Sequence, residues 1–200
     1  IASIQDAVVV MGFNGVRSLV LSAGFVHAFP AAAGSRFDRD AYWKRCFRVA
    51  GYAKALAQSL RQEPQMTFTA AMFHEIGQLV LDVCMPAQFA EVLQQHETSG
   101  RSLLEIEQAE FGFDHAEIGA EMARHWNFPL EIEHAIRYWA TPEQEPFRPV
   151  NGLVYAAVLL ESGLRGEDFI SRIPQSLCKR LNLSWERIAD GLPETEALDA

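Results

Sequence analysis

The sequence predicts an all-α fold, and three observations support this prediction. Apolar residues recur every three or four positions along most of the chain, without a sustained two-residue alternation, which favours helices over strands. Residues that start or stop helices occur at intervals of helix length. The 200 residues are 49% apolar and 22% charged, a globular composition that excludes a disordered chain. A chain of this length can bury a core without disulfides or metals.

The first helices are expected to begin at capping residues. Ser3 gives a start that resembles a capping box, and Gly12 ends this short helix. Asn14 can cap a second helix, which runs as far as an alanine-rich loop. After that loop, either Asp38 or Asp40 can cap a long third helix.

Proline, glycine and paired capping residues define the next three helices. Thr67 opens a segment that is expected to stay helical as far as residue 84. Pro86 suits the first turn of the following helix, and Gly100 stops it. Ser102 with Glu105 forms the pattern of a capping box, which predicts the start of a helix there.

The remaining helices follow from the same signals. Asp114 with Glu117 is a second capping-box pattern, and Pro129 begins the helix after it. Residues 141–149 hold three prolines and form a connector, and residues 150–164 form the most apolar helix of the chain. The helices are thus expected at 3–12, 14–29, 38–63, 68–84, 87–97, 102–112, 114–127, 129–140 and 150–164, with short pieces around Ser171, Ser176 and Ser184.

Charge and cysteine content exclude several classes of protein. The net charge of −9 disfavours binding of nucleic acid through bulk charge. No apolar run reaches the ~18 residues that a membrane span needs. Cys46, Cys84 and Cys178 are an odd number at wide spacing, which favours a reducing compartment and hence a cytoplasmic protein. Cys46 and Cys84 are expected to be small core residues.

The segment around His74-Glu75 carries the first candidate site. An imidazole next to a carboxylate suits a metal or phosphate site, although a buried histidine bonded to its neighbours is the simpler interpretation. Gly77 is a poor helix former, and its missing side chain indicates close approach of another helix. The apolar positions expected to face the core are Phe73, Ile76, Val80 and Cys84.

The second candidate lies at the start of the helix that Asp114 caps. His115 falls in the first turn, where the helix dipole favours a neutral imidazole that can accept a hydrogen bond or bind a metal. Gly119 again indicates close helix packing, so His74 and His115 are expected on different helices that approach each other. No role is expected for the remaining histidines, His27, His96, His125 and His134.

These segments resemble a known family. The run 73–77, Phe-His-Glu-Ile-Gly, resembles the signature of the HD superfamily of helical metal-dependent phosphohydrolases. The runs 113–120 and 125–129 resemble the HDOD branch, the HD-related output domain. The opening residues 1–8 and the pair at 42–43 resemble the same branch. The similarity covers about residues 1–165 and implies a compact multi-helical HD-superfamily-like domain.

The resemblance also implies a ligand set that this chain keeps only in part. Active HD enzymes bind their metal through histidines, a His-Asp pair and a later aspartate. The pair is His74-Glu75 here, so a glutamate stands in place of the aspartate. The glutamate side chain is one methylene longer, which would disturb a site that needs ~0.5 Å precision. The positions that the resemblance assigns to other ligands carry Arg45 or Cys46, Tyr138 and Trp139, and Ala157 or Val158. Only His74, Glu75 and His115 survive as a remnant pocket.

Two parts are expected in the chain. Residues 1–165 form the HDOD-like domain, which by the resemblance is expected to lack upstream helices and so to expose Val8, Val9 and Met11 unless a partner covers them. Residues 166–200 are expected to form short helices and an acidic tail, since residues 186–200 contain five acids and only one base, Arg187.

Three functions remain open at this stage. The first is a non-catalytic output module of a bacterial signalling protein, which acts through contacts with other signalling proteins or domains, with a homo-oligomer possible. It would have no catalytic residue, no cofactor and no metal, and would bind neither nucleic acid nor membrane. The second is a degenerate metal-dependent phosphohydrolase or phosphodiesterase with one divalent metal weakly bound at His74, Glu75 and His115. The third is a nucleotide-binding sensor without turnover.

Overall fold

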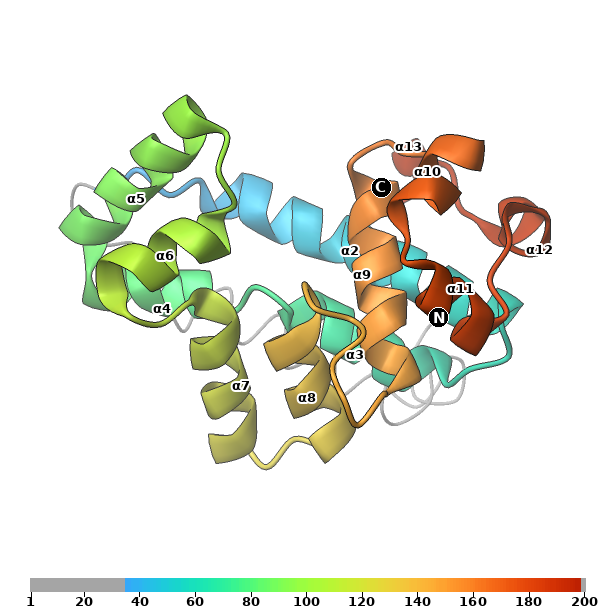
Figure 1. Cartoon of the computed structure of the whole chain (residues 1–200). Coiled ribbons are helices and arrows are strands. Elements are labelled where there is room, and N and C mark those ends of the chain that lie inside the picture. Colours follow the sequence, from blue (N-terminus) through green and yellow to red (C-terminus); the bar gives the residue numbers. More distant parts are fainter. Residues whose placement is uncertain (1–34, 199–200) are drawn as a thin grey trace, which may run out of the picture.

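The computed structural model describes residues 35–198, and this part of the chain is helical without any strand (Figure 1). The all-α prediction is therefore confirmed. The helices predicted at 3–12 and 14–29, and the exposure predicted for Val8, Val9 and Met11, lie outside the described residues. No described helix is both long enough and apolar enough to cross a membrane.

The elements follow each other with short connections. They are α2 (Arg39–Ser59), α3 (Pro64–Phe73), α4 (Gly77–Cys84), α5 (Pro86–Ser99), α6 (Leu103–Phe111), α7 (His115–His125), α8 (Leu130–Tyr138), α9 (Pro149–Glu161), α10 (Gly166–Arg172), α11 (Gln175–Leu181), α12 (Trp185–Ile188), the 3₁₀ helix η1 (Ala189–Gly191) and α13 (Thr195–Leu198).

Within residues 35–198 most predicted caps form, but two do not. Thr67 was expected to open a helix, whereas α3 begins earlier, with Glu63 as its cap and Pro64 in its first turn. Of the two candidates for α2, Asp38 is the cap, since its carboxylate accepts a hydrogen bond from the backbone N–H of Ala41 at 2.9 Å. Asp114 and Glu117 complete the predicted capping box of α7. The box predicted at Ser102 is wrong, because the Ser102 side chain makes no capping bond and only its carbonyl accepts from the first turn of α6.

The helix predicted over 68–84 is in fact two helices, α3 and α4, broken at residues 74–76. Through the break, backbone N–H groups bond to carbonyls three residues earlier, as Ile76 does to Phe73 at 3.0 Å, which tightens the turn. The turn changes the buried face of α4, so Leu79 and Leu81 point inward. The predicted core positions of Val80 and Cys84 are wrong, because Val80 is only partly buried and Cys84 is exposed.

The main core is built around α2, which packs on α3 and α9 (Figure 1). The C-terminal helices join the same core, in which Phe169, Leu177 and Ile188 are fully buried. The segment expected as an acidic tail contains α12, η1 and α13, and α13 lies on α2. There the Thr195 hydroxyl is 2.9 Å from the hydroxyl of the buried Tyr52.

Helices α5 and α6 have an apolar cluster of their own. Phe89 and Val92 from α5 and Ile106 from α6 pack with Leu81 of α4. Phe37 links this cluster to the main core, because its ring lies 5.6 Å from Phe89 and 5.3 Å from Tyr42. The helices α5 and α6 therefore form a small unit at one end of α2, opposite α10–α13 (Figure 1).

Candidate functional site

His74 lies in the turn between α3 and α4 and is fully buried. Its Nδ1 is 2.6 Å from the carbonyl oxygen of Ala71. A carbonyl can only accept, so Nδ1 carries the proton and Nε2 is the bare nitrogen. Burial lowers the pKa of His74 to about 4, and its imidazole is therefore neutral at pH 7. Its Nε2 has no hydrogen-bond partner and lies 3.8 Å from a carboxylate oxygen of Glu75.

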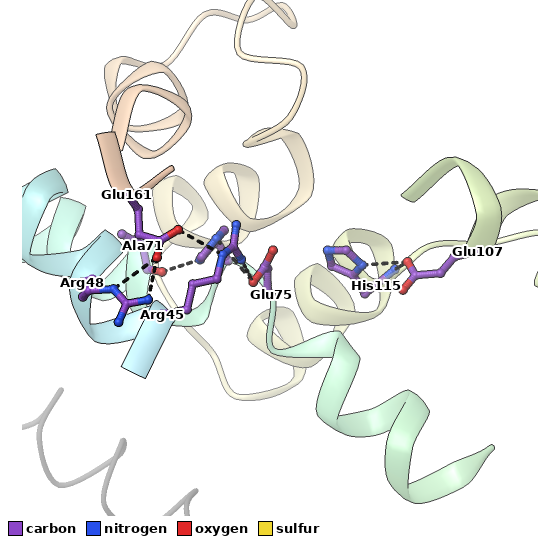
Figure 2. Close-up of polar contacts among 8 residues, drawn as sticks. Arg45, Arg48, Ala71, Glu75, Glu107, His115 and Glu161 are labelled. Carbon is purple, nitrogen blue, oxygen red and sulfur yellow. Dashed lines mark hydrogen bonds and ion pairs between the residues drawn. The ribbon is translucent and has the colours of Figure 1, made fainter. Parts of the chain in front are cut away.

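Glu75 is the next residue of the turn, and its carboxylate is paired with Arg45 of α2 (Figure 2). The Glu75 side chain is 7% exposed and that of Arg45 is 33% exposed. Burial alone would raise the pKa of Glu75, but the neighbouring His74, Arg45 and His115 together outweigh this effect, and the pKa is held at about 2. Glu75 is therefore an anion whose charge is already neutralised by a side chain of the protein.

Arg45 lies between two carboxylates, as Figure 2 shows. Besides Glu75 it contacts Glu161 at the end of α9, with its Nε 3.3 Å from the carboxylate. Arg48, one turn further along α2, donates to the other oxygen of Glu161 at 2.8 Å. Cys46, the other residue expected near the first ligand position, is fully buried, and its thiol pKa is raised by burial.

His115 begins α7, as predicted, and is 1% exposed. Its Nδ1 lies 2.7 Å from Glu107 of α6, and the same carboxylate oxygen accepts the backbone N–H of His115 at 2.8 Å. Burial by itself would lower the pKa of this imidazole, but the Glu107 carboxylate raises it above the ordinary value. The Nε2 atom has no hydrogen-bond partner.

Trp139 brings the two histidines together. Its indole meets the His74 ring edge-on at 5.1 Å between centroids and stacks on the His115 ring at 6.4 Å. The predicted approach of the two histidines is therefore confirmed. The close packing predicted at Gly77 is also confirmed, because a Cβ there would lie 2.1 Å from the carbonyl oxygen of His115. At Gly119 a Cβ would lie 2.9 Å from the Ile136 side chain.

Two partners in this site were not predicted from the sequence. The late acidic ligand was expected at Ala157 or Val158, whereas the acid that reaches the site is Glu161, one helical turn beyond Ala157. Glu107 is the second, and it is fully buried. The sequence did carry one signal for Glu107. It is an acid next to the apolar Ile106, on the helix that directly precedes the one starting at His115.

The side chains present do not fit the metal site that the HD resemblance implies. In the described range 35–198, no group of three or more His, Cys, Asp or Glu side chains is arranged to hold an ion. The reason is visible at Glu75, where the Arg45 guanidinium occupies the carboxylate. A metal would have to displace this cation before it could bind there.

Comparison with known proteins identifies the family. The family model of the HDOD domain matches residues 1–142, so the chain belongs to the HDOD family. An uncharacterized protein of Treponema pallidum is 24% identical over 190 residues, which is 92% of this chain. The chain spans 36% of the length of that relative.

Solved structures share the fold over most or all of the chain. A protein from Shewanella amazonensis, provisionally named a phosphohydrolase, is 26% identical with a TM-score of 0.76, covering 100% of this chain and 78% of that one. A protein from Marinobacter aquaeolei, provisionally named a signal transduction protein, is 25% identical with a TM-score of 0.72, covering 94% of this chain and 42% of that one. The chain is thus an HDOD domain with an HD-superfamily fold.

Proposed function

We propose that this domain is a non-catalytic regulatory module of a cytoplasmic bacterial signalling protein. In this proposal it transmits a signal through contacts with other signalling proteins or with further copies of itself. It does not hydrolyse phosphate esters with a metal. One observation carries the proposal, namely the ion pair between Arg45 and Glu75 at the place where the resemblance implies a metal ligand.

Arg45 acts as a permanent positive charge that neutralises the Glu75 carboxylate. Arg45 stays protonated at any physiological pH, and Glu161 holds it from the other side. Removing Arg45 would leave the buried Glu75 carboxylate without its cation, which costs about 1–3 kcal/mol for a pair whose arginine is 33% exposed. A hydrolytic metal must also keep an open position for water and lower the pKa of that water toward ~7. A carboxylate already bound by a guanidinium contributes to neither requirement.

The test is an activity and metal-binding assay on the purified chain. The protein is treated with chelator, reloaded with manganese, iron or zinc, and assayed against nucleotides, cyclic dinucleotides and a generic phosphodiester. We expect no metal-dependent turnover. Metal-dependent turnover that is lost in His74→Ala would overturn the proposal.

A designed gain of binding tests the role of Arg45 directly. Arg45→His removes the cation from Glu75 and supplies an imidazole at the position that the resemblance assigns to a ligand. We expect zinc to bind this variant more tightly than the unchanged chain in calorimetric titration. Equal zinc binding by the two proteins would show that Arg45 does not block the site.

A second candidate function is metal-dependent hydrolysis at a degenerate HD site. The observation that favours it is the Glu107–His115 pair, because histidines that bind metals usually donate their other ring N–H to a carboxylate or carbonyl. The provisional name of the Shewanella amazonensis protein points the same way. The turnover assay above separates the two candidates, and His115→Ala should then abolish the activity.

A further inference from the structure

A pocket of about 530 Å³ lies between the α5–α6 unit and the face that holds Glu75 and His115. This volume is within the ~300–1,000 Å³ that small-molecule sites usually have. Leu93 of α5 and Leu103 of α6 line one side. The polar and aromatic residues that line the other side are Tyr42, Arg45, Glu75, Gln78, His115 and Trp139.

Three of these residues have buried polar atoms without hydrogen-bond partners. They are the hydroxyl oxygen of Tyr42, Nε2 of His115 and Nε1 of Trp139. Buried polar atoms in native proteins nearly always have a partner, so three such atoms beside one pocket point to a ligand. The Nδ1 side of His115 is fixed by Glu107, and the opposite edge of the ring faces the carboxylate of Glu75 (Figure 2).

The charges around the pocket nearly balance, which disfavours a strongly charged ligand. The lining residues include two arginines and three acids, namely Arg36, Arg45, Asp38, Glu75 and Glu97. Arg45 is already engaged by two carboxylates. A phosphate would therefore meet acids as well as bases, whereas an uncharged molecule would meet no net repulsion.

The side chains favour a planar ligand that both donates and accepts hydrogen bonds. Phe37, Tyr42 and Trp139 supply aromatic walls, against which a flat ring packs well. The indole N–H of Trp139 only donates, while the Gln78 amide can do both. The bare Nε2 of neutral His115 accepts, and its protonated form donates.

We propose that this pocket binds a neutral, planar aromatic molecule with an amide-like edge, and that it does so without a metal. Trp139 and His115 then bind the polar edge, while the leucines of α5 and α6 cover the ring. Such a ligand would be the input of the regulatory module, so the inference rests on the function proposed above. Because Leu93 and Leu103 come from α5 and α6, binding would also hold these helices against the rest of the domain.

Saturation-transfer NMR with nicotinamide as the probe tests the inference, with benzoate and inorganic phosphate as charged comparisons. We expect saturable binding of nicotinamide to the chelator-treated chain, and weaker binding of benzoate and phosphate. Trp139→Phe keeps the aromatic ring but removes the N–H, so it should weaken nicotinamide about threefold to tenfold, as expected for one hydrogen bond. His115→Gln should weaken it similarly.

Tyr138→Phe is the matched control, because Tyr138 neighbours Trp139 but does not line this pocket. It should leave nicotinamide binding unchanged, and circular dichroism checks that each variant is folded. Absence of nicotinamide binding, or stronger binding of benzoate or phosphate, would overturn the inference. That result is distinct from failure of the proposed function, which only metal-dependent turnover would show.

Discussion

Gly77 lies directly against the backbone of His115. A Cβ on Gly77 would lie 2.1 Å from the His115 carbonyl oxygen and 2.9 Å from its Cα. The first residue of α4 and the first residue of α7 are therefore in van der Waals contact through main-chain atoms. This contact places His115 beside the His74–Glu75 turn, and neither backbone can give way without moving a helix.

Gly77→Ala is expected to destabilise the fold by at least about 1–3 kcal/mol, the usual cost of overpacking a core. In an unobstructed helix the same change would be favourable by ~1 kcal/mol. Chemical denaturation measures the difference. Gly51→Ala is the matched control, because the added methyl there meets only the flexible end of Leu198. Equal stability of the two variants would contradict the contact.

Arg45→Gln is expected to destabilise the protein by about 1–3 kcal/mol at pH 7, because Glu75 is left buried without its cation. The native pKa of Glu75 is about 2, below its unfolded value near ~4.3. The stabilisation is therefore complete above pH ~4.3 and is lost as the pH falls toward 2. Denaturation at pH 7 and pH 3 should show a smaller difference at pH 3. Arg124→Gln, which breaks an exposed pair with Glu121, should change stability little at either pH.

Glu107→Gln is expected to lower the pKa of His115. In the unchanged chain Glu107 raises this pKa above the ordinary value, so the pair stabilises the fold fully below pH ~6.5 and loses that effect as the imidazole deprotonates at higher pH. The amide removes the negative charge, and burial then dominates. NMR titration of the His115 ring should give a midpoint above ~6.5 before the change and below it afterwards. An unchanged midpoint would exclude Glu107 as the cause.

His74 is expected to behave in the opposite way. Its pKa is lowered to about 4, so the unfolded chain takes up a proton first, and stability falls as the pH drops from ~6.5 toward 4. The same NMR titration should show His74 neutral at pH 6. His74→Ala should cost about 1–3 kcal/mol, as for a buried group whose hydrogen bond to Ala71 is lost. A His74 ring that titrates near the ordinary value would contradict its burial.

Sequence signals predicted helix caps and close helix packing well where the feature depends on a few neighbouring residues. Asp38 and the Asp114–Glu117 box cap their helices, and the two glycines of the candidate site allow the close packing expected of them. Capping depends on residues within one turn, and a glycine in a helix indicates what its missing side chain allows. The family resemblance added the identity of His74, Glu75 and His115, which the structure does bring to one place.

The break of the helix at residues 74–76 could not be predicted from periodicity. Ile76 and Leu79 remain apolar and buried on both sides of it, so the sequence pattern looks continuous. The break coincides with the packing of Gly77 on His115, which is far away in the sequence. Glu107 and Glu161 were missed for a related reason, because an acid on a helix is normally exposed and only the tertiary fold brings a histidine or an arginine to it.

The charge that neutralises Glu75 is covalently part of the chain, unlike a bound ion, which dissociates. It cannot be diluted, exchanged for a competing ion or removed by a chelator. Arg45 joins α2, the α3–α4 turn and the end of α9 through Glu75 and Glu161. The joint between these three segments is therefore made by side chains of the chain itself.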